Sequence, residues 1–152
     1  MKKRVISLLM AYTLIICLLP VQVLADEPRE TVTRYADGSY IVTSVEESVT
    51  ARVYGTKSGT AIKNYYSDNN VLQWKAVLDA TFTYNGSSAT CTKVNGLNVT
   101  IYDSSWSVGS KSTSKSGNTA YGYLTMERSI LGGTQGVPVT LALTCDRNGN
   151  LS

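Results

Sequence analysis

The side chains that most often carry out chemistry in proteins are sparse in this sequence, and histidine is missing altogether. Without imidazole the chain cannot form a Ser-His-Asp or Cys-His site, and it lacks the commonest zinc ligand. The carboxylates are scattered, and the adjacent Glu46 and Glu47 point to opposite faces if they lie on a strand. They therefore do not predict the paired acids of a glycoside hydrolase. A small hydrolase that uses carboxylates alone remains the third choice of function.

Two short motifs resemble chemical sites but are better explained as turns. Residues 112–115 (Ser-Thr-Ser-Lys) match the serine–lysine signature of penicillin-recognising enzymes. The other two boxes of that signature, 67–69 and 57–59, come in reversed order, and the chain is too short for that fold. Residues 146–150 place oxygen ligands at alternate positions, as calcium loops do, but the glycine comes too early. We predict no catalytic residue, no metal site and no cofactor.

Tyrosine is the residue type that best suits a binding surface, and the sequence has ten of them. Tyr121 and Tyr123 are two residues apart, so they share one face of a strand, opposite the apolar side chains of the same segment. Tyr65 and Tyr66 lie next to each other in a polar stretch. Exposed phenol rings stack on sugars or fill pockets of protein partners. Tyrosine is also common on sheet faces that are partly exposed to solvent, without any binding role. We predict these four tyrosines as possible binding residues.

The chain begins with the pattern of a secretory signal peptide. Residues 1–4 are basic after the initial Met, Val5–Leu19 is apolar, and Val23-Leu24-Ala25 places small residues before a cut. An uncleaved anchor is the alternative, because no charge follows until Asp26. Pro20 interrupts the segment where an anchor should continue. We predict that residues 1–25 are a signal peptide, and that the protein is secreted with no membrane segment after cleavage.

The net charge excludes one class of partner. Lys2, Lys3 and Arg4 account for the whole formal charge of +3, and all three lie in the predicted signal peptide. The rest of the chain has 11 basic and 11 acidic side chains and is formally neutral. A neutral domain offers no electrostatic footprint for nucleic acid or anionic lipid. We therefore expect an unknown extracellular protein or a glycan as the partner, and no nucleic acid.

Two cysteines, Cys91 and Cys145, remain after the predicted signal peptide. An even number in an exported chain predicts a disulfide bond. The neighbours of both residues place them on inward-facing sides of strands. A buried free pair is the alternative, whereas two thiolates without histidine make a poor zinc site. We predict a Cys91–Cys145 disulfide inside the core.

Strand-forming residues dominate the chain after the signal. From Leu72 to Tyr84 every even position is apolar, which predicts a strand with one buried face. Its length predicts a bend near Asp79-Ala80. Residues 137–145 alternate in the same way. The other predicted strands are 39–45, 48–54, 88–94, 97–102, 106–111 and 118–126.

Turn residues mark the breaks between these strands. Asn85-Gly86 and Asn95-Gly96 each predict a tight hairpin turn. Residues 55–70 are predicted to be a long polar connection, and residues 112–117 a polar hairpin tip. Seven to eight short strands at this spacing predict an all-β fold, a single antiparallel β-sandwich or a partly open barrel.

Part of the sequence resembles a scattered group of small exported proteins from Gram-positive bacteria that have no assigned activity. The resemblance covers Trp74 to Cys91, including Phe82-Thr83-Tyr84-Asn85-Gly86-Ser87, and the ending Leu143–Ser152. These residues form turn and core features, so the resemblance implies no functional residues.

These observations together predict a signal peptide (1–25), a flexible N-terminal tail (26–38) and one β-sandwich domain (39–152). We expect the domain to be a secreted, non-catalytic module that binds a glycan, the cell wall or a protein. The alternative from a different class is a secreted antagonistic protein of the toxin-like, bacteriocin type. Growth inhibition by the purified protein would separate the two.

Overall fold

The structure is a computed structural model that describes residues 29–47 and 54–152. Every regular element in this part of the chain is a β-strand. The described residues include no helix that is long and apolar enough to cross a membrane. The predicted signal peptide and residues 48–53 of the predicted strand 48–54 lie outside the described residues. The all-β prediction is confirmed.

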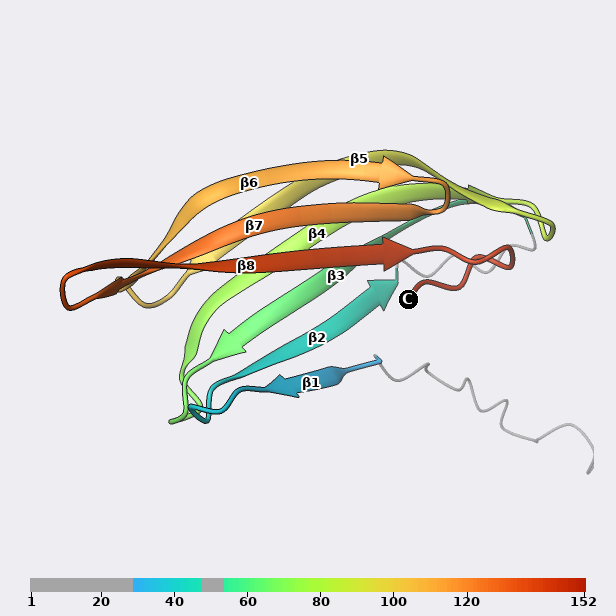
Figure 1. The fold of residues 1–152 in the computed structure, drawn as a ribbon. Helices are drawn as coiled ribbons and strands as arrows, with labels where there is room; N and C mark the ends of the chain where they lie inside the picture. Colours follow the sequence, from blue (N-terminus) through green and yellow to red (C-terminus); the bar gives the residue numbers. More distant parts are fainter. Residues whose placement is uncertain (1–28, 48–53) are drawn as a thin grey trace, which may run out of the picture.

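In the described residues, eight strands form two separate antiparallel sheets, which confirms the sandwich (Figure 1). Within each sheet every strand pairs with the next one along the chain, so both sheets are meanders. The five-stranded sheet contains β1 (Thr31–Arg34), β2 (Tyr40–Glu47), β3 (Gly55–Tyr66), β4 (Leu72–Tyr84) and β5 (Ala89–Ile101). The three-stranded sheet contains β6 (Trp106–Ser116), β7 (Thr119–Ile130) and β8 (Gly133–Thr144).

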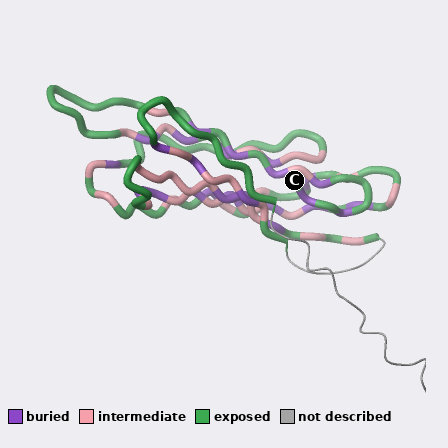
Figure 2. The backbone as a smooth tube through the Cα atoms, turned by 90° about the horizontal axis from the view of Figure 1, so that it is seen from below, coloured by how far each residue is buried: buried purple, intermediate pink, exposed green. Residues whose placement is uncertain are grey.

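The core lies between the two sheets and is centred on β4, which has the bounds that its alternation predicts. Trp74, Leu78 and Phe82 have no exposed surface. They pack in one cluster with inward side chains of the other sheet, among them Leu124 and Leu141. Figure 2 shows buried positions alternating with more exposed ones along both layers. The three-stranded sheet lies over β3, β4 and β5, with β6 next to β5 and β8 next to β3.

Strand β3 is the largest difference from the sequence prediction. The prediction of a polar connection over residues 55–70 is wrong, because residues 55–66 form a 12-residue strand between β2 and β4. The residues of β3 that share a face with the buried side of β4 are Gly55, Lys57, Gly59, Ala61, Lys63 and Tyr65. Most of these side chains are small or polar, so the strand has no apolar alternation to reveal it.

The predicted turn at Asn95-Gly96 is also wrong. Strand β5 continues through these residues, and Gly96 pairs with Asp79 while Val94 pairs with Ala80. Asn95 therefore has no partner on β4, which is the arrangement of a β-bulge. Its side-chain amide donates to the Thr81 hydroxyl at 3.0 Å. The bulge lies opposite the position where the length of β4 predicts a bend.

Two further segments are more regular than the sequence predicts. The predicted polar tip at 112–117 is part of β6, which continues to Ser116 before a short turn at Gly117-Asn118. Gly117 has φ +56°, a conformation that side chains disfavour. In the predicted flexible tail, residues 31–34 form β1, an exposed edge strand that pairs with β2.

The predicted disulfide is not present, although both cysteines are buried as expected. Cys91 and Cys145 are free thiols with 2% and 0% exposure. Each thiol donates to a nearby carbonyl, Cys91 to Lys93 at 3.8 Å and Cys145 to Asp146 at 3.4 Å. A disulfide requires Cβ atoms about 4 Å apart, and a shared apolar interior does not ensure this. Burial raises the pKa of both thiols, which disfavours the reactive thiolate.

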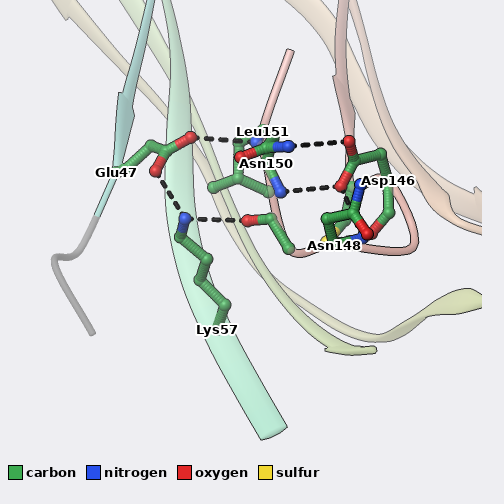
Figure 3. A network of polar contacts seen from close by, with 8 residues as sticks. Glu47, Lys57, Asp146, Asn148, Asn150 and Leu151 are labelled. Carbon is green, nitrogen blue, oxygen red and sulfur yellow. Dashed lines mark hydrogen bonds and ion pairs between the residues drawn. The ribbon is translucent and has the colours of Figure 1, made fainter. Parts of the chain in front are cut away.

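The C-terminal segment connects the two sheets after β8. The chain reverses through Asp146–Asn150, and Leu151 pairs with Cys145. One oxygen of Glu47 accepts the Leu151 N–H at 2.9 Å, and the other accepts from Lys57 Nζ (Figure 3). Lys57 also donates to the Gly149 carbonyl at 2.7 Å. Glu47 and Lys57 thus hold the C-terminal segment against β2 and β3.

We expect acid to weaken the attachment of the C-terminal segment to β2 and β3, because it protonates Glu47. Burial acts to raise the pKa of Glu47, but the hydrogen bonds from Lys57 and from the Leu151 N–H outweigh it and hold the pKa below its ordinary value of 4.5. A carboxyl with a depressed folded-state pKa stabilises the fold fully above its unfolded pKa, and that stabilisation is lost as pH falls through the folded value. Glu47→Gln should therefore lower the free energy of unfolding by up to about 1 kcal/mol at neutral pH, and by progressively less in acid.

Denaturant melts from neutral pH down to about pH 3 measure this effect. Glu46→Gln is the matched control, because Glu46 is the exposed neighbour on the opposite face of β2. It should keep the wild-type pH dependence. A difference between Glu47→Gln and wild type that stays constant from neutral pH to acid would contradict the prediction.

Candidate functional site

Tyr121 and Tyr123 lie on the outward side of β7 with their rings nearly parallel. The ring centroids are 6.1 Å apart and the ring planes differ by 13°. Tyr123 is 43% exposed and Tyr121 is half-buried. Ala120, Leu124 and Met126, which alternate with them, are buried. The strand therefore faces the way that the sequence predicts, and the two phenol rings are available at the surface.

Uncharged side chains from three strands surround this pair. The register of β6, β7 and β8 places one residue of each strand in a row across the outer side of the sheet. The rows are Ser114–Tyr121–Ala142, Ser112–Tyr123–Thr140 and Ser110–Thr125–Pro138. We name these nine residues the tyrosine face. None of them is charged, and the Ser110 hydroxyl donates to the Thr125 hydroxyl across the strands at 3.1 Å.

The lysines of β6 do not contribute to the tyrosine face. Lys111 and Lys115 alternate with the serines and therefore point to the other side of the strand. Lys111 Nζ donates to the Leu97 carbonyl at 3.3 Å, and Lys115 Nζ donates to the Thr92 carbonyl. Both acceptors are on β5, so the lysines tie the two sheets together. The serine–lysine motif at 112–115 is thus divided between opposite sides of one strand.

The second predicted pair, Tyr65 and Tyr66, does not form a joint surface. The predicted loop position is wrong, because both residues are on β3. Adjacent strand residues point to opposite faces. Tyr65 stacks on Trp74 with ring centroids 5.3 Å apart, and Tyr66 stacks on Tyr40 at 4.9 Å. The rings of these two tyrosines therefore belong to different aromatic clusters.

The carboxylate of Asp146 accepts hydrogen bonds within the turn at 146–150. Asp146 Oδ1 accepts the N–H groups of Asn148 and Asn150 at 2.8 and 2.9 Å. Asp146 Oδ2 accepts the side-chain amide of Asn150 at 2.8 Å (Figure 3). Residues 29–47 and 54–152 contain no group of three or more acidic or cysteine side chains that could hold a metal ion. The calcium-like spacing of this turn is thus explained by its own hydrogen bonds.

Comparisons with known proteins found a distant structural likeness. No family model matches the chain, and no curated protein matches it. Among solved structures, the crystal structure of a hypothetical protein from Listeria monocytogenes EGD-e is similar, with a TM-score of 0.45 and 17% sequence identity. The match covers 82% of this chain and 91% of that chain.

Proposed function

We propose that this protein is a non-catalytic binding domain that acts outside the cell, and that its tyrosine face binds a neutral glycan. The supporting observation is a pair of nearly parallel tyrosine rings, one exposed and one half-buried, among the uncharged residues of the tyrosine face. The proposal includes export through residues 1–25. N-terminal sequencing of the protein recovered from the culture medium tests that part.

The chemistry of the face suits sugars better than a charged partner. Residues two apart on a strand lie about 7 Å apart, a spacing that neighbouring sugar rings can match. Phenol rings offer apolar faces for the C–H side of a sugar, and the hydroxyl at the ring edge can still bond to water or ligand. The serine and threonine hydroxyls of the outer rows both donate and accept hydrogen bonds, as sugar hydroxyls do. Without charges on the face, binding should change little with ionic strength.

The double variant Tyr121→Ala/Tyr123→Ala tests the proposal. We expect it to weaken binding to purified cell-wall polysaccharide about tenfold or more, because two ring contacts of about 1 kcal/mol each are lost. Its denaturant melt should stay within about 1 kcal/mol of wild type, since the core side of β7 is unchanged. Depletion of the protein from solution by the polysaccharide measures binding. Tyr102→Ala is the matched control, because Tyr102 is 57% exposed and lies outside the tyrosine face.

Three outcomes would contradict the proposal. Wild-type protein that no polysaccharide depletes would reject glycan binding. Unchanged binding by a stable double variant would place the site elsewhere. Growth inhibition of neighbouring bacteria by wild-type protein, without polysaccharide binding, would favour the toxin-like alternative.

A further inference from the structure

A second surface feature lies at the end of the sandwich where β1 turns into β2 and β6 begins. At this end β1 and β2 lie beyond β8, which is one of the two edge strands of the three-stranded sheet (Figure 1). Two adjoining cavities of about 240 and 190 Å³ open here. Residues that line both are Asp37, Ser39, Tyr65, Trp106 and Arg128. We name the two cavities together the aromatic cleft.

Four aromatic rings form the apolar side of the aromatic cleft. Tyr65 is at the centre, stacked on Trp74 and edge-on to Trp106 with ring centroids 5.2 Å apart. Tyr35 contacts Tyr65 with a centroid distance of 6.4 Å, and it is 44% exposed. The rings therefore run without a break from the solvent to the core.

The two tryptophans carry buried hydrogen-bond donors that have no acceptor. Trp74 is fully buried and Trp106 is 5% exposed. The indole N–H of each is buried and has no hydrogen-bond partner in the part of the chain that the structure describes. A buried donor without an acceptor costs about 1–3 kcal/mol, so the presence of two such donors requires an explanation. Both residues line the smaller cavity, so the two unpaired donors lie at its wall and are closed off from solvent.

An acid and a base complete the polar side of the aromatic cleft. Asp37 Oδ1 accepts the hydroxyl and the N–H of Ser39 at 2.6 and 3.0 Å. These bonds lower the pKa of Asp37 below its ordinary value of 3.8, so the group is anionic at neutral pH. Both bonds use Oδ1, which leaves Oδ2 for a ligand donor. The Arg128 guanidinium lies over the Trp106 ring, 5.7 Å from its centroid, and supplies donors.

We infer that the aromatic cleft is a binding site for a single sugar ring. The C–H side of the ring packs against Tyr35 and Tyr65, its hydroxyls donate to Asp37, and its oxygens accept from Arg128. Each of the two cavities is by itself smaller than the 300–1,000 Å³ of sites for drug-sized ligands, a size that suits one sugar ring. The aromatic cleft is separate from the tyrosine face, because residues of both sheets line the cleft whereas the tyrosine face covers the outer side of the three-stranded sheet.

Tryptophan fluorescence tests this site directly, because Trp74 and Trp106 are the two tryptophans of the sequence. Purified protein is titrated with glucose, galactose and N-acetylglucosamine at millimolar concentrations. We expect at least one sugar to give a saturable change. Tyr35→Ala and Arg128→Gln should each weaken it about tenfold, through a lost ring contact or a lost charged hydrogen bond. Both replaced side chains are at the surface, so the variants should keep the wild-type melt.

Two further variants make the test specific. Asp37→Asn keeps one oxygen for the Ser39 bonds but replaces the other with an NH2 group that cannot accept from a sugar hydroxyl, so it should fold normally and bind the sugar more weakly. Tyr121→Ala/Tyr123→Ala should leave this titration unchanged, which separates the aromatic cleft from the tyrosine face. No saturable change with any of the three sugars would overturn the inference, as would a wild-type response in Tyr35→Ala and Arg128→Gln. Saturable binding of tetramethylammonium without sugar binding would also overturn it, in favour of an aromatic cage for cations.

Discussion

Replacing Trp74 with alanine is expected to lower the free energy of unfolding by about 3–5 kcal/mol. Trp74 has no exposed surface, and it contacts both layers through Tyr65 on β3 and Trp106 on β6. Its removal leaves a cavity between two hydrogen-bonded sheets, which cannot collapse into it without losing strand pairing. The variant also removes the unpaired indole N–H, but this gain offsets only part of the loss, because a buried unpaired donor costs about 1–3 kcal/mol.

Lys75→Ala is the matched control for Trp74→Ala. Lys75 is the next residue of β4, points to the opposite face and is only partly buried. We expect it to change stability by less than about 1 kcal/mol. Denaturant melts followed by circular dichroism measure both variants without relying on tryptophan emission. Similar losses at the two positions would show that the buried face of β4 is assigned wrongly.

A strand is well predicted from the sequence where one of its faces is buried, because apolar and polar residues then alternate along it. Strand β4 meets this condition, and its bounds follow from the sequence alone. Strand β3 does not, because close contacts keep its inward side chains small at some positions. A Cβ at Gly59 would lie 2.2 Å from Leu151 Cδ1 and 2.9 Å from the Glu46 carbonyl oxygen. Contacts of this kind come from distant residues, so no local pattern shows them.

The same limit explains which site features the sequence predicts. The outward pair Tyr121 and Tyr123 follows from residues two apart on one strand, a local relation. The uncharged rows around that pair depend on the register of β6 and β8 against β7. The aromatic cleft brings together residues from β2, β3, β4, β6, β7 and β8 with the turn at 35–39, so sequence reasoning missed it. The adjacent tyrosines at 65 and 66 were the one local signal near it.

Gly149→Ala is expected to lower the free energy of unfolding by about 3 kcal/mol, combining a strained backbone with a steric clash. Gly149 has φ +87°, in the left-handed region that disfavours side chains. A Cβ there would lie 2.6–2.9 Å from three carbons of the Tyr84 ring. Tyr84 is only 5% exposed, so its ring cannot move into solvent without opening the core.

Gly132→Ala is the matched control for the clash, because Gly132 has φ +95° and a Cβ there would meet nothing within 4 Å. It should cost only the left-handed backbone, about 1–2 kcal/mol. The difference between the two variants in urea unfolding therefore measures the packing of the C-terminal turn on Tyr84. Because the same turn is held by Lys57 through the Gly149 carbonyl, we also expect Gly149→Ala to reduce the effect of Glu47→Gln when the two are combined. Equal losses from Gly149→Ala and Gly132→Ala would mean that the turn does not pack on Tyr84 in solution.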